Sequence, residues 1–262
     1  MLQRMLGLAL EAGGVKGFSH IATIKLFNIC NTKPDIISGS SFGSIVGTLY
    51  ALYEDADEIY QMLSDNIEDF LKENSKQKIN SFEMIIKESL FTLDEYYRFF
   101  KKLYGKKKFS DLRIPTIVVA FDLESMNSII LDEGFLVDAV LASCTVPGVF
   151  EPTYLSGSKL LDGGVLSPLP TNELKKYGAK RIVASIFEER KISYINKMEL
   201  MVYLDSLKGD KILEDELTLA DFVFSYPVKV DWSEFHKYRD VYKSALDIAL
   251  KRRDEFEDFI RR

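Results

Sequence analysis

A serine between two glycines is the residue in this chain best suited to covalent chemistry. The stretch GSSFG, residues 39–43, fits the pattern G-x-S-x-G, which alone is a weak signal because it also arises by chance. An apolar stretch at residues 36–38 precedes it and a helical pattern follows, as in a nucleophile elbow, which exposes a serine hydroxyl at the end of a strand. We therefore expect Ser41 to be a nucleophile, with Gly39 and Gly43 permitting close approach of the flanking chain. A helix N-cap made of small residues explains one serine but not both glycines.

A glycine-rich turn, GGVKG at residues 13–17, follows the first apolar run and precedes a helical pattern. Two functions compete for it. A dinucleotide-binding turn would need a glycine where Ala12 stands and an acidic residue at the end of the second strand, whereas Asp35 lies before that strand. The other function is an oxyanion hole, in which backbone N–H groups stabilise a developing alkoxide. Parallel strands would bring this turn beside Ser41, since both follow the carboxyl end of a strand. For Lys16 we favour a solvated side chain over a charge directed at the site.

A nucleophilic serine needs a proton acceptor, and the chain has two histidines, His20 and His236. We expect His20 to be a structural hydrogen-bonding residue. His236 would complete a Ser–Asp–His triad in an α/β-hydrolase, but those enzymes place the nucleophile after several strands rather than at residue 41. Asp162, followed by two glycines after a short apolar strand, is the better candidate, although the local sequence alone favours a simple Asp-Gly β-turn.

Taken together and in this order, the motifs resemble the patatin-like phospholipase family. The resemblance rests on residues 13–17, residues 39–43 and the DGG of residues 162–164. The stretch ASCTVPGVF, residues 142–150, is similar to the family's A-S-x-A-x-P-x-x-F segment, with threonine in place of the second alanine. The similarity covers residues 5–53 and 114–187. Ala12 departs from the family's longer glycine run and would reshape the turn.

The resemblance implies a serine acyl-ester hydrolase of lipids that uses a Ser–Asp dyad. Ser41 would attack the ester carbonyl and Asp162 would accept its proton. The backbone N–H groups of Gly13, Gly14 and Val15 would form the oxyanion hole. The residues that support these motifs would be Lys16, Gly17, Gly39, Gly43, Gly163 and Gly164. The resemblance implies neither a metal nor another cofactor, and the scarcity of histidine agrees with a dyad independently.

The order of strand and helix patterns predicts one α/β domain over residues 1–262. The resemblance implies a three-layer α/β/α sandwich with a mostly parallel central sheet. Residues 54–110 contain one glycine and no proline and predict a helical insertion. Residues 91–108 of this insertion are rich in aromatic residues and lysines, which fits two interpretations. They could form a lid or an acyl-chain pocket that lies on an anionic membrane surface. Alternatively, they form a helix whose aromatic face packs on the core and whose basic end is solvated. We favour the packed helix. Residues 238–262 predict a single charged amphipathic helix.

The composition and net charge of the chain limit the other functions that it could have. A net charge of −6 argues against nucleic-acid binding. Cys30 and Cys144 lie far apart, with no Cys/His cluster for a structural zinc. The apolar N-terminal run leads into the glycine turn, so we interpret it as a buried strand rather than a signal peptide. We expect a cytoplasmic protein that can also contact a membrane surface peripherally. The sequence does not indicate an oligomeric state. A silent scaffold of the same fold and a nucleotide-binding module are the alternatives to an enzyme.

Overall fold

The computed structural model describes residues 5–73, 93–188 and 197–262, with the side chains of residues 197–206 outside the description. The strands are β1 (Leu6–Leu10), β2 (Ile36–Ser40), β3 (Thr116–Asp122), β4 (Asn127–Leu131), β5 (Thr153–Leu155), β6 (Ser158–Asp162), β7 (Arg181–Phe187) and β8 (Phe222–Tyr226). The helices are α1 (Phe18–Ile29), α2 (Phe42–Tyr53), α3 (Ala56–Glu73), α5 (Leu93–Tyr104), α6 (Leu136–Ser143), α7 (Thr171–Lys176), α8 (Lys197–Leu217), α9 (Tyr238–Lys251) and α10 (Arg253–Arg261).

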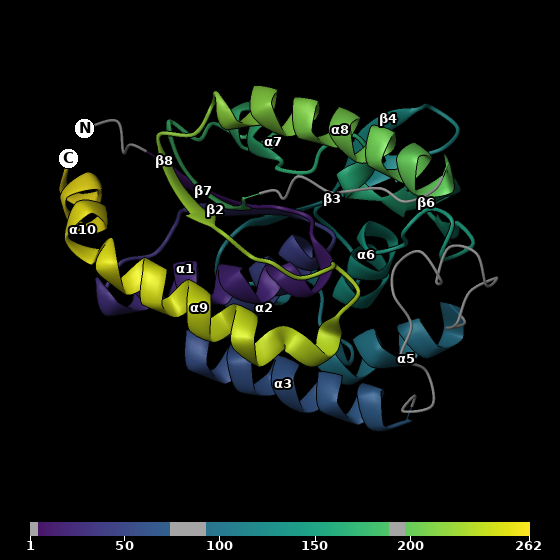
Figure 1. The fold of residues 1–262 in the computed structure, drawn as a ribbon, viewed down its shortest axis with the longest axis horizontal. Coiled ribbons are helices and arrows are strands. Elements are labelled where there is room, and N and C mark those ends of the chain that lie inside the picture. The colour runs from purple at the N-terminus through teal and green to yellow at the C-terminus, as the bar shows by residue number, and fades with distance from the viewer. Residues whose placement is uncertain (1–4, 74–92, 189–196) are drawn as a thin grey trace.

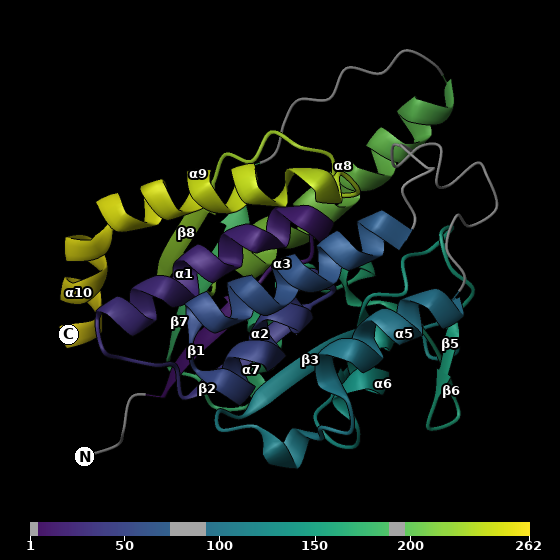
Figure 2. The ribbon, with the colours of Figure 1, turned by 90° about the horizontal axis from the view of Figure 1, so that it is seen from below.

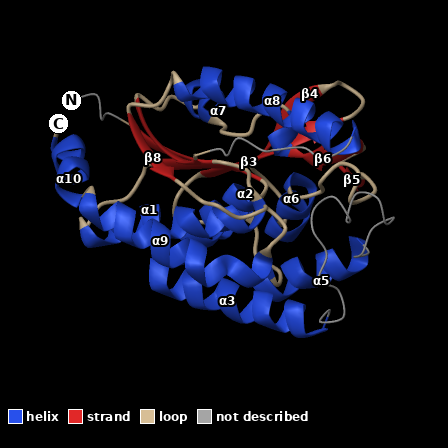
Figure 3. Ribbon diagram, viewed as in Figure 1, coloured by secondary structure: helices blue, strands red, loops and turns tan. Residues whose placement is uncertain are grey.

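A central sheet lies between two layers of helices. Figure 1 shows α7 and α8 on one face and α1, α2, α3 and α9 on the other. Figure 2 shows α1, α3 and α9 lying alongside one another, and colouring by secondary structure makes the three layers plain (Figure 3). The α/β/α sandwich expected from the sequence is therefore confirmed.

The sheet is mostly parallel, as expected. Its strands follow the order β5-β6-β3-β2-β1-β7-β8, with β4 paired to β3. The neighbours β3, β2, β1, β7 and β8 run parallel, whereas β4, β5 and β6 pair antiparallel. Every residue of β1, β2 and β3 is buried, because helices cover both faces. Burial on both faces explains why these strands read as nearly continuous apolar runs rather than alternating ones.

Strand β3 holds the ends of two other strands against each other. Its residues 118–119 pair with both β4 and β2, and its residues 120–122 pair with both β4 and β6. A strand has only two edges. Since β4 occupies one edge of β3, strands β2 and β6 share the other edge. β2 ends at Ser40, opposite Val119, and antiparallel β6 ends at Asp162, opposite the next residue of β3. The register on β3 therefore brings the end of β6 to the turn that follows β2.

The helical insertion is confirmed where it is described. Helices α3 and α5 account for most of it, and a short 3₁₀ turn at Phe109–Asp111 ends it. Residues 74–92 lie outside the described residues, so the expectation of helix there is untested. Helix α8, on the opposite face, and the three-residue strand β5 have no counterpart in the sequence interpretation.

The single C-terminal helix expected over residues 238–262 is wrong. Two helices, α9 and α10, are separated at Arg252, whose φ of −97° and ψ of 10° leave helical geometry. The guanidinium of Arg252 donates to the carbonyl of Val223 in strand β8 and lies 4.6 Å from the ring centroid of Phe222. This contact ties the junction of the two helices to the edge strand of the sheet.

Candidate active site

Ser41 occupies a strained turn between β2 and α2. Its φ of 51° and ψ of −126° are sparsely populated for a residue other than glycine, which costs on the order of 1–3 kcal/mol. The Ser41 N–H donates to Oγ of Ser143 at 2.9 Å, and the Ser143 hydroxyl donates to the carbonyl of Val119 at 2.6 Å. The Ser41 carbonyl accepts from both the N–H and the hydroxyl of Ser44. These four hydrogen bonds hold the backbone of the expected nucleophile elbow.

The two glycines of the pentapeptide are required by close packing of the chain. A Cβ at Gly43 would lie 2.3 Å from the carbonyl oxygen of Leu10, at the end of β1. A Cβ at Gly39 would lie 2.5 Å from backbone atoms of Gly43. Any side chain at either position would push α2 away from the strand ends. The glycines therefore set the position of the N-terminus of α2, on which Ser41 sits.

Asp162 ends β6 within contact of Ser41. Its N–H donates to the carbonyl of Thr145 and its Oδ1 accepts from the N–H of Gly164, both at 2.8 Å. The carboxyl is 6% exposed, and this burial raises its pKa to about 6. Hydrogen bonding from the Ser41 side chain and from Gly164 acts in the opposite direction, toward the ionised form. The structure thus brings together the two residues that the sequence named as nucleophile and base.

Cys144 is a buried thiol in the same neighbourhood. Burial raises its pKa well above the ordinary value, and the charge of Asp162 adds to that shift. Hydrogen bonds with Ser44 and Ser41 lower it in part. A thiol, unlike a thiolate, is a poor nucleophile, so Cys144 is poorly suited to covalent chemistry.

The glycine turn forms a 3₁₀ segment, Gly14–Gly17, that leads into α1. Gly14 has a φ of 56°, and a Cβ there would lie 2.3 Å from the carbonyl oxygen of Trp232. Among the residues that the structure describes, no acceptor binds the N–H groups of Gly13 and Gly14. The N–H of Val15, in contrast, donates to the carbonyl of Trp232 at 2.9 Å. The expectation for Val15 is therefore not met in this conformation, because the segment before α9 packs onto the turn and takes its N–H.

The other motif residues pack the turn against its surroundings. The Lys16 residue is partly buried, and its ammonium forms no ion pair with any residue in the described ranges. A Cβ at Gly17 would meet the ring of Phe42, and one at Gly163 would lie 2.2 Å from the carbonyl oxygen of Val119. A Cβ at Gly164 would lie 2.9 Å from the Cβ of Ala12, the residue before the glycine turn. The Asp162 turn and the glycine turn are therefore in direct contact.

Comparison with known proteins assigns this arrangement to a family. The family model described as patatin-like phospholipase matches residues 8–175, which contain all of these motifs. The chain belongs to the patatin-like phospholipase family. The membership that the sequence motifs indicated is confirmed.

Curated relatives of this patatin-like chain are much longer proteins. Lysophospholipase NTE1 of Scheffersomyces stipitis is 31% identical over 246 residues, covering 94% of this chain and 14% of the relative. Patatin-like phospholipase domain-containing protein 6 of Homo sapiens is 28% identical over 211 residues, covering 78% and 14%. The chain spans about one seventh of the curated relatives it matches. The crystal structure of VipD from Legionella pneumophila, at 15% identity and a TM-score of 0.54, covers 95% of this chain and 66% of VipD and shares the fold.

Among the described residues, neither histidine of this patatin-like chain forms a hydrogen bond to Ser41 or Asp162. His20 is fully buried, with Nδ1 2.8 Å from Oγ of Ser185 and Nε2 2.8 Å from the carbonyl oxygen of Glu11. Burial lowers the pKa of His20 to about 4, so it is neutral and structural, as expected. His236 is exposed in a 3₁₀ turn before α9, and within the described part of the chain it forms no hydrogen bond to Ser41.

Helix α5 of the insertion packs its aromatic side chains against the core along its length. The ring of Tyr96 stacks on that of Phe150 at a centroid distance of 4.6 Å. Burial raises the pKa of Tyr96, and the charge of Asp162 adds to the effect, so this ring lies near Asp162. Beyond the end of the helix, Lys108 lies over the ring of Phe135, 4.8 Å from its centroid. The aromatic face packs as we favoured.

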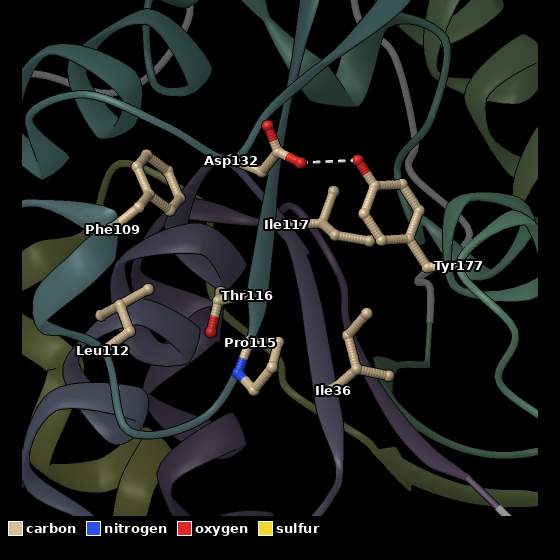
Figure 4. A pocket seen from close by; sticks show the side chains of 8 residues that line it. All are labelled: Ile36, Phe109, Leu112, Pro115, Thr116, Ile117, Asp132 and Tyr177. Carbon is tan, nitrogen blue, oxygen red and sulfur yellow. Dashed lines mark hydrogen bonds between the residues drawn. The ribbon is translucent and has the colours of Figure 1, made fainter.

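Two cavities differ in their relation to Ser41. The one in Figure 4 has a volume of about 160 Å³ and lies where β2 and β3 begin, at the opposite end of these strands from Ser41. Its polar pair is Asp132 and Tyr177, whose carboxylate and hydroxyl lie 2.6 Å apart. The second has a volume of about 350 Å³ and lies beside α5, α6 and β5. Its lining is mostly apolar and consists of Leu93, Asp138, Leu141, Pro152, Thr153, Tyr154 and Leu155.

Among the described residues, no group of three His, Cys, Asp or Glu side chains is arranged to hold a metal ion. No helix within the same ranges has the length and apolarity to cross a membrane.

The sequence interpretation missed two contributors to the site. Ser143, which fixes the Ser41 N–H, lies inside the stretch ASCTVPGVF, but nothing local reveals its partner. Trp232, which binds the N–H of Val15, is the only tryptophan of the chain and lies in no motif. Both contacts join segments about 100 or more residues apart, which a local pattern does not encode.

Substitution Gly43→Ala tests the packing at the elbow. We expect the free energy of unfolding to fall by about 1–3 kcal/mol, because the new methyl would overlap the Leu10 carbonyl and backbone must move. Thermal and denaturant unfolding measure this change. Gly209→Ala in α8, where a Cβ meets no atom within 4 Å, is the control and should be neutral or stabilising by up to about 1 kcal/mol. Equal effects of the two substitutions would contradict the packing argument.

Proposed function

We propose that this chain hydrolyses acyl esters of lipids with Ser41 as nucleophile and Asp162 as its base. The observation that carries the proposal is the contact between a serine in a strained elbow and a buried carboxyl at the end of β6. Membership in the patatin-like phospholipase family supports the same chemistry. The lysophospholipase names of several relatives support a single-chain phospholipid as the first substrate to test.

The proposed reaction has two half-reactions. Ionised Asp162 accepts the Ser41 proton while Oγ of Ser41 bonds to the acyl carbonyl carbon, giving a tetrahedral oxyanion. Collapse breaks the bond to the alcohol, which leaves with the proton from Asp162. A water then loses a proton to Asp162 and attacks the acyl-enzyme, and departure of Ser41 takes that proton back. The products are a fatty acid and the alcohol, and Asp162 ends ionised as it began.

Backbone dipoles would stabilise the oxyanion. The open N–H groups of Gly13 and Gly14 are the donors nearest in sequence to the β1 terminus, and β1 lies beside β2. Preorganised donors of this kind are each worth about 3 kcal/mol in the transition state. Ser41 is also the N-cap of α2, so the positive end of that helix dipole lies at the reacting oxygen. Val15 could contribute only if its N–H left Trp232.

Apolar surroundings on one side of Asp162 would receive the acyl chain. The stacked pair Tyr96 and Phe150 lies there, and the cavity of about 350 Å³ adjoins α5 on the same side. Tyr154 is 71% exposed and Leu166, in the loop after Asp162, is 40% exposed. We propose that lipid surface is contacted at this end of the molecule.

Substitution Ser41→Ala tests the nucleophile. A fluorophosphonate, which phosphonylates an activated serine, should label the wild type and not the variant, because the attacking oxygen is gone. In-gel fluorescence with a known hydrolase as positive control measures the labelling. Ser143→Ala should retain labelling at a reduced rate. Absence of labelling in the wild type would overturn the proposal and favour a catalytically silent member of the fold.

The pH dependence tests the base. The raised pKa of Asp162 means that the carboxylate form, which accepts the proton, predominates only above about pH 6. We expect kcat/KM for a soluble ester to rise with pH through about 6. Asp162→Asn should lower kcat by about 10²–10⁴-fold and remove this dependence.

The matched control is Asp132→Asn, which removes a carboxylate at the opposite end of the strands and should leave the profile unchanged. An Asp162→Asn variant that keeps the rise near pH 6 would show that another group is the base, and loss of turnover in His236→Ala would point to that histidine.

A further inference from the structure

One short segment of chain, residues 167–170, contacts strand β2 next to Ser41. The Ser40 hydroxyl, adjacent to Ser41, donates to the carbonyl of Ser167 at 2.6 Å. Two residues earlier on the same strand, the Ser38 hydroxyl donates to the carbonyl of Pro170 at 2.8 Å. All these side chains are buried, so solvent does not compete for the two bonds. The 167–170 segment therefore fixes the strand that presents Ser41.

The same segment contacts the other two parts of the site. The N–H of Ala12, which precedes the glycine turn, donates to the carbonyl of Pro168 at 2.9 Å. The N–H of Ser167 donates to the carbonyl of Gly163, which follows Asp162, at 3.0 Å. The 167–170 segment thus binds the nucleophile strand, the glycine turn and the Asp162 turn at once. A shift of this segment would displace all three relative to one another.

Helix α8 anchors the 167–170 segment from the other face of the sheet, where it lies beside α7 (Figure 1). Glu216 is 3% exposed, and its Oε1 lies 2.6 Å from Oγ of Ser167. Its Oε2 accepts from the N–H of Leu169 at 2.7 Å, and its backbone carbonyl accepts from the Thr171 hydroxyl at 2.7 Å. One residue of α8 therefore makes three hydrogen bonds to alternate residues of the stretch 167–171.

The network around Glu216 requires a proton. Oγ of Ser167 lies between two carboxyls, since Oε2 of Glu173 is 3.2 Å from it on the other side. A single hydroxyl proton cannot serve both carboxyl oxygens. Burial raises the pKa of Glu216 to about 8, and the charge of Glu173 acts in the same direction. At neutral pH the Glu216 carboxyl therefore keeps its proton, which completes the network.

We propose that Glu216 is a positioning residue: its carboxyl locks the 167–170 segment and through it the relative placement of Ser41, Asp162 and the glycine turn. This inference rests on the proposed hydrolase function. Glu216 touches neither Ser41 nor Asp162, so it acts through the backbone carbonyls of the segment. The charged group that faces it among the described residues is Glu173 of α7, whose other oxygen lies 3.9 Å from Nζ of Lys176.

Two substitutions of Glu216 separate positioning from mere stability. Glu216→Gln keeps one acceptor for Leu169 and one donor for Ser167, as the protonated acid does, and should react with a fluorophosphonate at close to the wild-type rate. Glu216→Ala removes both and should lower kcat by about 10²-fold with little change in KM, because misplacement of reacting groups by about 1 Å has that cost. Circular dichroism measures whether each variant is folded.

The alkaline pH profile supplies a readout that a structural role would not move. In the wild type, turnover should fall as pH rises through about 8, because Glu216 loses the proton that the network needs. Glu216→Gln has no such proton to lose and should retain turnover across this range. A Glu216→Gln profile identical to the wild type, or a Glu216→Ala variant with wild-type kcat, would overturn the proposal.

Amide hydrogen exchange makes the test independent of hydrolysis. In Glu216→Ala, peptides covering residues 8–17 and 163–171 should exchange faster than the same peptides of the wild type and of Glu216→Gln. The exchange rate of the peptide that covers α9 should be the same in all three proteins. If the wild type does not react with the probe, the proposed function fails, and the exchange pattern still decides the role of Glu216. Unchanged exchange at residues 8–17 in Glu216→Ala would contradict it.

Discussion

The arrangement of this site depends on the pairing register of β3. One edge of that strand receives the end of β2 and the end of antiparallel β6 at successive residues, so Ser41 and Asp162 meet although they are far apart in sequence. Side-chain direction alternates along a strand, and a shift of β6 by one residue would turn Asp162 to the opposite face. Sheet pairing, rather than any local motif, therefore decides that the two residues can act together.

Burial sets the protonation of the groups around Ser41. Removal from water raises the pKa of Asp162 into the range where a carboxylate is an effective base near neutral pH. The same exclusion of water keeps His20 neutral and Cys144 a thiol, so neither competes for the role. A second buried carboxyl, Glu216, holds the surrounding loops without touching the reacting atoms. Desolvation thus serves both the proposed catalysis and the rigidity of the site.

The sequence predicted most of the fold because its signals were local. Apolar runs beside glycine turns indicate β1, β2 and β6, and the motifs that follow them contain Ser41 and Asp162. The rest depended on long-range contacts. The helices break at Arg252, whose side chain bonds to β8, and the carbonyl of Trp232 accepts the N–H of Val15. Neither partner could be identified from residue type or spacing.

Covalent attachment of the acyl group to Ser41 is the central claim, and mass spectrometry tests it most directly. Wild-type protein mixed with a single-chain phospholipid and quenched in acid during turnover should yield a peptide containing residues 39–43 that is heavier by one acyl group, with fragment ions placing it on Ser41. An acyl group found on another residue, or turnover with no acyl-enzyme in a protein whose Ser41→Ala variant remains active, would contradict the account.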